Sequence, residues 1–454
     1  MKTKYSSQFE RMTTAPVGRL TISLAIPTTI SMLVTAVYNL VDSYFVGLLE
    51  SNSASGAVGV VFSFMAIMQA VGFMYGQGSG SIVSRLLGSK DNKKASSIAS
   101  TGFFLAFTTG LFIFALGSCF KSEMIYLFGS TDTIYPFAEQ YFTYLLWAAP
   151  FNVSGFVLNN VLRYEGKAKL SMIGLLSGSI INIGLDPLFM FGFDMGMAGA
   201  ALATSISQVI SFSILLFMFL SGRTESRISL KSFTKKPGDI ADIIGTGFPS
   251  LLRQGLGSIS GMMLNNAAKL YGDAAVAAMS IVNRISMLIF SAGLGIGQGF
   301  QPVCGFNYGA KKYGRVRQAY FFTLKVALVL LGIFATIGMI SAEGAVGIFR
   351  NDADVIEIGT GALRFQCISL YVIPIMVTTN MLLQSSGQKL AASFTAMLRN
   401  GIYYIPLLLL LSKYVGLEGI QATQMAADLL SVATCIPIAG RFLHRLKKLD
   451  EKKE

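Results

Sequence analysis

Twelve stretches of more than 20 mostly apolar residues recur along this chain, with short polar segments between them. A helix that crosses the hydrocarbon core of a bilayer needs about 20 such residues. We therefore predict an all-α membrane protein with twelve transmembrane helices. The spans are expected at residues 20–48, 56–80, 98–118, 137–162, 170–192, 197–221, 242–270, 275–302, 318–340, 358–384, 391–412 and 417–441.

The composition excludes several soluble classes of protein. Only 13% of the residues are charged, whereas soluble domains carry about 25%. The four cysteines are far apart and lie in or beside apolar runs, so we expect buried free thiols and no disulfide scaffold. A single histidine, His444, gives no basis for a transition-metal site. The first apolar run is too long for a signal-peptide core, so helix 1 is expected to stay in the protein.

Basic residues predict the orientation in the membrane, because Lys and Arg resist translocation. The even-numbered loops hold seventeen of them, at 85–94, 163–169, 223–236, 311–317 and 389, whereas the odd-numbered loops hold four. We expect a multi-pass protein of the cell membrane with both termini in the cytoplasm. The net charge of +13 is then explained by basic loops against anionic lipid headgroups, and no nucleic-acid partner is expected.

The chain contains one unit twice. A shift of 221 positions aligns Gly76-Gln77-Gly78 with Gly297-Gln298-Gly299, and Asn159 with Asn380. The predicted organisation is an N-terminal lobe at 1–221, a linker at 222–241, a C-terminal lobe at 242–441 and a basic tail at 442–454. Because six helices precede the second copy, both lobes have the same orientation, and a pseudo-twofold axis along the membrane normal relates them.

A parallel repeat of this kind is typical of transporters that work by alternating access between two lobes. The opposing interpretation is a large bundle that moves nothing. Gly72, Gly76 and Gly80 recur every four residues, a spacing that favours close helix packing over a ligand-binding loop. No phosphate-binding GxxxxGK[ST] sequence is present, so ATP-driven pumping by this chain is not supported.

Acids inside the spans are the functional candidates, because a charge in the membrane is costly. Asp42 and Asp186 fall in the outer halves of helices 1 and 5. Asn182 shares a helix face with Asp186, and Thr204 of helix 6 reaches a similar depth. Two carboxylates in a poorly solvated site favour a bound proton or a shared cation, with Na⁺ and H⁺ equally suited.

Structural roles for these acids remain open. In that alternative, Asp186 only satisfies backbone groups beside Pro187, and Asp42 forms a structural pair. Asp428 in helix 12 is expected to pair with a buried arginine, and the candidates are Arg253 and Arg284.

With these residues in place, the sequence resembles the multidrug and toxic compound extrusion family over nearly its whole length. The resemblance implies a two-lobed exporter of organic cations driven by H⁺ or Na⁺. It also implies a coupling site of Asp42, Asn182, Asp186 and Thr204, and a bend of helix 1 at Pro27. The motifs that carry the resemblance are Tyr38-Asn39-Leu40-Val41-Asp42, Asn182-xxx-Asp186-Pro187, Gly196-Met197-Ala198-Gly199-Ala200-Ala201 and the twofold Gly-Gln-Gly.

The resemblance further places Asn159 among the coupling residues, and Tyr38, Asp186 and Asn159 among the substrate-binding residues. Na⁺, if it is the coupling ion, is expected at Asp42 and Asp186, and no other cofactor is implied. Members with acids in helices 7 and 10 are not matched, since those helices offer Arg253, Gln254, Arg364 and Asn380. We expect a monomer that contacts membrane lipids and small organic cations.

Two other functions are weighed against export. A lipid-linked saccharide flippase of the same superfamily would need more buried Arg and Lys residues for an anionic pyrophosphate. A membrane-embedded prenyl transferase would need clustered aspartates, and the sequence has no Asp-Asp pair. The sequence therefore favours an antiporter over an enzyme.

Overall fold

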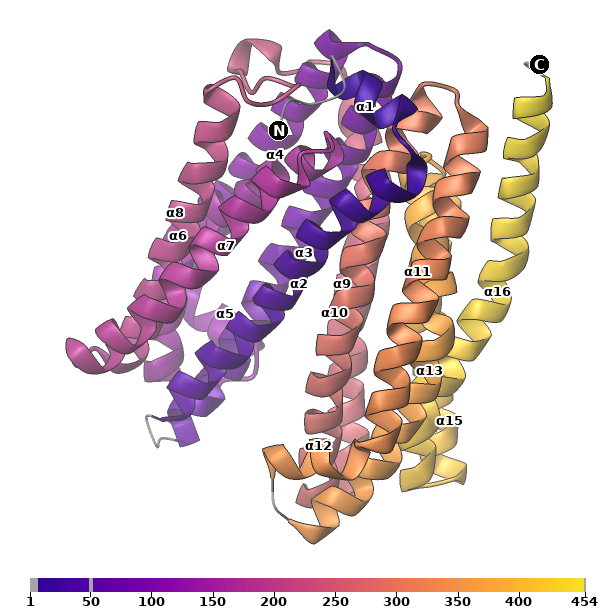
Figure 1. Ribbon diagram of the computed structural model, residues 1–454. Coiled ribbons are helices and arrows are strands. Elements are labelled where there is room, and N and C mark those ends of the chain that lie inside the picture. Colours follow the sequence, from indigo (N-terminus) through magenta and orange to yellow (C-terminus); the bar gives the residue numbers. More distant parts are fainter. Residues whose placement is uncertain (1–6, 49–51, 351, 453–454) are drawn as a thin grey trace. The chain divides into compact units, whose positions relative to one another are not determined.

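The computed structural model describes residues 7–48, 52–350 and 352–452. These residues form α-helices, two 3₁₀ turns and two π-helical segments, and no strand (Figure 1). The elements are α1(Gln8–Thr14), α2(Val17–Gly47), α3(Asn52–Gly88), α4(Asn92–Cys119), α5(Lys121–Leu127), α6(Tyr135–Tyr164), α7(Ala168–Pro187), η1(Leu188–Gly192), α8(Gly196–Leu220), η2(Leu230–Ser232), α9(Pro237–Ala268), η3(Lys269–Tyr271), α10(Asp273–Gly309), α11(Tyr313–Ile340), α12(Ala342–Phe349), α13(Ala353–Ser385), α14(Lys389–Met397), η4(Leu398–Ile402), α15(Tyr404–Tyr414) and α16(Leu417–Glu451).

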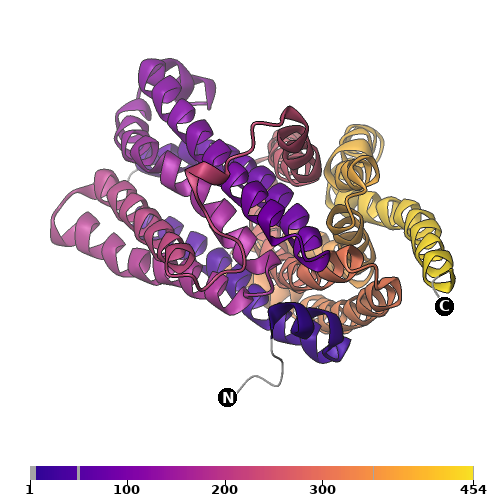
Figure 2. The ribbon, with the colours of Figure 1, turned by 90° about the horizontal axis from the view of Figure 1, so that it is seen from above.

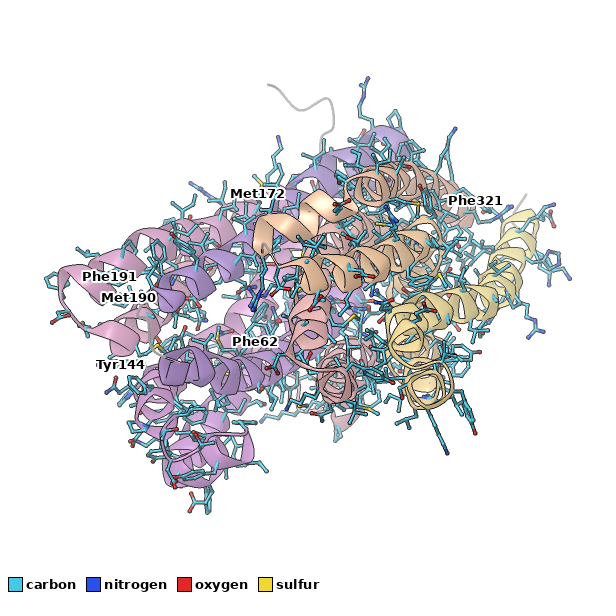
Figure 3. The ribbon with its side chains drawn as sticks, turned by 90° about the horizontal axis from the view of Figure 1, so that it is seen from below. Phe62, Tyr144, Met172, Met190, Phe191 and Phe321 are labelled. Carbon is cyan, nitrogen blue, oxygen red and sulfur yellow. The ribbon has the colours of Figure 1, made fainter. Side chains whose placement is uncertain are left out.

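Eleven segments of the described chain are long and apolar enough to cross a membrane. They coincide with eleven of the twelve predicted spans. The remaining one, α9, has 32 residues but carries Arg253 and Gln254 near its middle, which lowers its hydropathy. Large apolar side chains are exposed on many helices, for example Phe62, Phe191 and Phe321 (Figure 3). Such exposure suits a lipid environment, and the all-α membrane fold is confirmed.

The duplication is visible in the backbone. Lys90 and Lys311 are 221 positions apart, and both adopt the left-handed conformation, with φ of 65° and 58°. Gly166 and Gly387 have the same spacing, with φ of 79° and 76°. A non-glycine residue rarely adopts positive φ, so its recurrence at the repeat distance shows that the two copies fold alike at these turns.

The regularly spaced glycines of α3 lie at helix interfaces, as predicted. A Cβ atom on Gly76 would lie 2.8 Å from the carbonyl oxygen of Phe156, and one on Gly80 would lie 2.4 Å from the ring of Tyr164, both in α6. A Cβ atom on Gly78 would come within 2.1 Å of the carbonyl oxygen of Ile243 in α9. These distances leave no room for a side chain, so glycine permits the helices to touch.

The chain divides into two compact units. Unit 1 comprises residues 1–29 and 252–454, and unit 2 comprises residues 30–251. The divisions fall inside α2 and α9, shortly after Pro27 and Pro249. Both helices continue through their proline. The predicted lobes follow the sequence repeat. The compact units do not, because unit 1 contains the first part of α2, the first long helix of the N-terminal repeat. Unit 2 contains the first part of α9, the first long helix of the C-terminal repeat.

Short α1 is held firmly against unit 1 (Figure 2). The side chain of Asn307 donates to the carbonyl oxygen of Met12 at 3.0 Å, and Lys312 donates to that of Thr13 at 2.9 Å. Arg315 donates to the carbonyl oxygen of Ala15 at 2.6 Å. Carbonyl groups at a helix end lack helical partners, so these three donors fix the chain where it enters α2.

The segment 222–236, which joins the two repeats, is held in unit 2 by Glu165. This buried carboxylate accepts hydrogen bonds from the backbone N–H groups of Glu225 and Ser226, each at 2.8 Å, and from the Ser226 hydroxyl. Burial raises the pKa of Glu165, and the accepted hydrogen bonds and the charge of Lys167 oppose that rise. The linker is therefore attached to unit 2 at Glu225 and Ser226.

One expectation about the cysteines is wrong. Cys304, Cys367 and Cys435 are buried free thiols, but Cys119 is exposed, because it is the last residue of α4.

Candidate functional site

Four of the predicted coupling residues lie together in unit 2. Asn182 of α7 donates from its amide nitrogen to Asp186 Oδ1 at 3.1 Å and to the hydroxyl of Thr204 in α8 at 3.3 Å. Asp42 of α2 is close enough to Asp186 for their charges to interact. Asn182, Asp186 and Thr204 are all at most 1% exposed. Residues from three helices thus form one polar cluster, and of these four only Asp42 is partly exposed.

The cluster leaves three buried acceptor atoms without a hydrogen-bond partner among the described residues. These atoms are Asp42 Oδ1, Asn182 Oδ1 and Asp186 Oδ2. A buried polar atom without a partner costs free energy and is uncommon in native proteins. A proton or a hard cation such as Na⁺ would satisfy atoms of this kind.

Local sequence explains how the cluster is built. Asn182 and Asp186 are four residues apart and share one face of α7. The α-helical part ends at Pro187, and the π-helical segment η1 follows directly. A Cβ atom on Gly199 of α8 would lie 2.6 Å from the backbone of Phe189 in η1. Glycine therefore lets α8 approach η1, and Thr204 follows just over one turn later.

Of the three other predicted residues, Tyr38 lies in the cluster, whereas Asn159 and Pro27 do not. Tyr38 lies close enough to Thr204, Asp42 and Asp186 to interact with all three, so Tyr38 belongs to the cluster. Asn159 instead donates from its amide nitrogen to the carbonyl oxygen of Ser171 at 3.0 Å, and thereby joins α6 to α7. Pro27 lies in unit 1 and is buried inside α2.

The expected partner of Asp428 is wrong. Asp428 is fully buried and pairs with Arg399, whose Nε lies 2.9 Å from Asp428 Oδ1. Gln424 and Ser369 also donate to this carboxylate. Arg253 instead donates to the side-chain oxygen of Asn380 at 3.1 Å. Asp428 is structurally paired, as predicted, but through a different arginine.

Sequence reasoning missed two residues. Tyr141 of α6 places its hydroxyl 3.5 Å from that of Thr204 and so joins the cluster. A tyrosine in a membrane helix is common, so nothing in its position stood out. Arg399 was detectable, because it is a charge inside the predicted span 391–412. Its place in the π-helical segment η4 was not, since π-helical turns have no simple sequence signature.

Comparison with known sequences gives the same family along both repeats. The family model MatE matches residues 27–188 and again residues 249–410. The multidrug export protein MepA of Staphylococcus aureus strain MSSA476 is 27% identical over 450 residues, which cover 98% of each chain. The protein of the same name from Staphylococcus saprophyticus is 27% identical over 422 residues, 93% of each chain.

Solved structures agree over the full length. One is an outward-facing multidrug resistance MATE family transporter of the MOP superfamily, 26% identical, covering 99% of this chain and 100% of its own, with a TM-score of 0.92. Another is a MOP superfamily transporter from Pyrococcus furiosus, whose reversed pocket polarity suggests a different function for it. It is 26% identical, covers 98% of this chain and 100% of its own, and has a TM-score of 0.90. With both repeats matched and the fold shared throughout, this chain belongs to the MatE family of membrane transporters.

Proposed function

We propose that this protein is a secondary multidrug exporter, which expels organic cations in exchange for inward-moving H⁺ or Na⁺. The observation that carries the proposal is the pair of interacting carboxylates, Asp42 and Asp186, with acceptor atoms that no described residue satisfies. The names of the MepA relatives support the class of substrate.

The chemistry of the cluster suits an exchange of cations. When both carboxylates are ionised they repel each other, and binding one positive ion relieves that repulsion. A proton would bind one carboxylate, whereas Na⁺ would use carboxylate, amide and hydroxyl oxygen atoms together. In both cases the inward-moving ion competes with a cationic drug for the same negative charge.

We further propose that the protein lies in the cell membrane with both termini in the cytoplasm, as the distribution of basic loop residues indicates. In that orientation Asp42 and Asp186 lie in the outer halves of their helices, within reach of ions from outside.

Dye efflux from proteoliposomes tests the proposal. Purified protein is reconstituted with ethidium inside, and a pH gradient or a Na⁺ gradient is imposed separately at zero membrane potential. Efflux that follows one gradient identifies the coupling ion. Efflux that follows neither, in vesicles shown to contain folded protein, would contradict ion-coupled export and leave lipid-linked substrates to be tested.

A further inference from the structure

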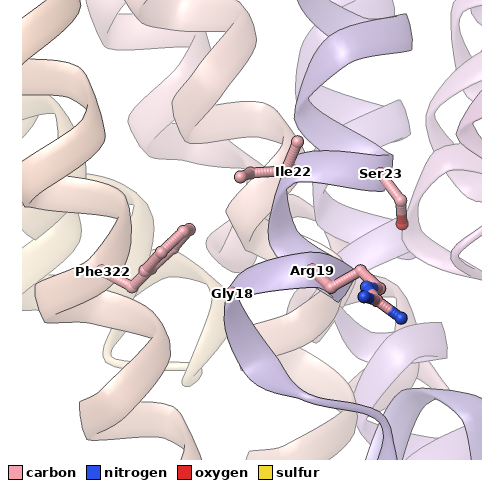
Figure 4. Close-up of a pocket in the computed structure, with 5 residues that line it drawn as sticks. All are labelled: Gly18, Arg19, Ile22, Ser23 and Phe322. Carbon is pink, nitrogen blue, oxygen red and sulfur yellow. The ribbon is translucent and has the colours of Figure 1, made fainter.

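The first turns of α2 form one wall of an open cleft in unit 1. The cleft has a volume of about 500 Å³ and is lined by Gly18, Arg19, Ile22, Ser23 and Phe322 (Figure 4). A Cβ atom on Gly18 would lie 2.9 Å from the ring of Phe322 in α11, so glycine allows the two helices to meet at its base. The cleft combines a guanidinium and a hydroxyl group with apolar side chains.

A second guanidinium converges on the same place. Arg11 of α1 donates to the hydroxyl of Ser23 at 3.4 Å, and Arg19 lies one turn before Ser23 on the same face of α2. The bonds from Lys312 and Arg315 hold α1 in place. Arg11 therefore approaches the cleft from a fixed helix.

The charge at this site is uncompensated. Neither Arg11 nor Arg19 forms an ion pair with a carboxylate in the described part of the chain. Two guanidinium groups that share no carboxylate favour an anion at this place.

The depth of the site matches the membrane surface. The span that begins in α2 covers Val17–Val46, 30 residues, or about 45 Å of helix, which is close to the thickness of a bilayer with its headgroups. Arg19, in the first turn, would lie among the headgroups. On the same face, Ile22 is 42% exposed and Ile26 is 55% exposed, at the level of the acyl chains.

We propose that this cleft binds an anionic glycerophospholipid of the surrounding membrane. Arg11 and Arg19 bind its phosphate, and Ile22 and Ile26 contact an acyl chain. The Ser23 hydroxyl donates to the carbonyl oxygen of Leu20 at 2.7 Å and accepts from Arg11, so it holds Arg11 in place. A free phosphate would use the two guanidinium groups alone, whereas the exposed isoleucines continuing the same face assign a lipid. The site requires only that the protein spans a bilayer, and it does not depend on which molecule is exported.

Thermal unfolding of the full chain in detergent tests the site. Dioleoyl phosphatidylglycerol is titrated, with dioleoyl phosphatidylcholine as the zwitterionic comparison, into the parent, Arg11→Gln, Arg19→Gln and the double variant. Each change removes a direct hydrogen bond between a guanidinium and the phosphate, which contributes about 1.5 kcal/mol, and is expected to weaken half-saturation about tenfold. Arg227→Gln is the control, because it removes one exposed arginine from the linker in unit 2.

Two further measurements keep the lipid assignment testable. Ile22→Glu, a change at an exposed position, is expected to remove the preference for phosphatidylglycerol, and Arg19→Lys is expected to keep most of it. If Arg227→Gln loses as much affinity as the cleft variants, general surface charge explains binding and the site is refuted. If inorganic phosphate at matched concentration reproduces the full thermal shift, the cleft binds a free anion and the lipid assignment is wrong.

Discussion

The amide nitrogen of Asn182 donates to Asp186 Oδ1 over 3.1 Å, while Asn182 Oδ1 and Asp186 Oδ2 have no partner in the described part of the chain. A purely structural asparagine–aspartate pair would be expected to use its remaining acceptors as well. The arrangement instead presents two oxygen atoms beside Asp42, and the first predictions concern what occupies them.

Neutralising either carboxylate is expected to abolish transport without unfolding the protein. Asp186→Asn and Asp42→Asn remove a titratable charge and keep the shape of the side chain. Ethidium efflux from intact cells should fall to the level of cells without the transporter, with membrane abundance near that of the parent. Asp194→Asn, in an exposed loop, is the matched control and should transport normally. A well-expressed Asp186→Asn that exports at the parental rate would remove this residue from the coupling site.

Drug and ion are expected to weaken each other's binding by the same factor, because linkage is reciprocal. A coupling of about 1 to 3 kcal/mol corresponds to a roughly 5- to 150-fold change in affinity. Drug affinity in detergent should fall on acidification if H⁺ is the ion, or when Na⁺ replaces choline at constant ionic strength if Na⁺ is. Asp186→Asn should flatten the response. An affinity indifferent to both ions would rule out competition at this cluster.

The Asp428–Arg399 pair is expected to be structural, with an asymmetric response to mutation. Asp428 is fully buried, whereas the Arg399 side chain is 17% exposed. Arg399→Leu therefore leaves a buried carboxylate without its cation and should cost about 3 to 5 kcal/mol. Asp428→Leu should cost less, since Arg399 can reach solvent. The double variant should be more stable than Arg399→Leu. If the double variant lost at least as much free energy of unfolding as the two single variants lose together, the pairing would be contradicted.

The attachment of the linker is expected to depend on pH through Glu165. Burial raises its pKa in the folded protein, so the folded state binds the proton more tightly than the unfolded state does. The stability from Glu165 is complete below its unfolded pKa and declines as pH rises through the folded pKa. Hydrogen exchange at the Glu225 and Ser226 amides, corrected for intrinsic rates, should show protection falling over that range. Glu165→Gln should remove this pH dependence of protection. If the variant keeps the same pH profile, a group other than Glu165 causes the dependence.

Topology gives the last prediction. A reporter active only outside the membrane, fused to the C-terminus, should stay silent, because the even-numbered loops hold seventeen of the basic loop residues against four in the odd-numbered loops. The same reporter inserted after Lys121 should be active. A strong signal from the C-terminal fusion would reverse the proposed orientation.

The sequence was sufficient for the spans, the repeat and the main cluster, because each depends on a simple property. Hydrophobic length identifies membrane helices, and a fixed offset identifies the duplication. Asp42 and Asp186 were detectable since charge is rare in a membrane helix. The i, i+4 spacing then placed Asn182 on the same helix face as Asp186, and the structure contains a hydrogen bond between the two side chains.

Features that depend on packing between distant helices were not predictable. Asn159 bonds to the backbone of the neighbouring helix, and Asn380 repeats this bond with Ala392. A sequence cannot distinguish such an amide from one aimed at a ligand. Arg399, which pairs with Asp428 in place of Arg253 or Arg284, lies in the π-helical segment η4, and a sequence gives no simple signal for such a segment. The division of α2 and α9 between compact units has no local signal at all.

That division bears on how such a protein arises and is made. Unit 2 is one continuous segment, residues 30–251, whereas unit 1 joins residues 1–29 to residues 252–454. On the ribosome, unit 2 is complete before most of unit 1 exists, and the partners of the first 29 residues, such as Gly295, Asn307 and Arg315, are synthesised only after unit 2. A single-repeat ancestor with this organisation would be a domain-swapped dimer, in which the first half of each copy's first helix packs in the other copy. Gene fusion would then have made permanent an exchange that already held two chains together.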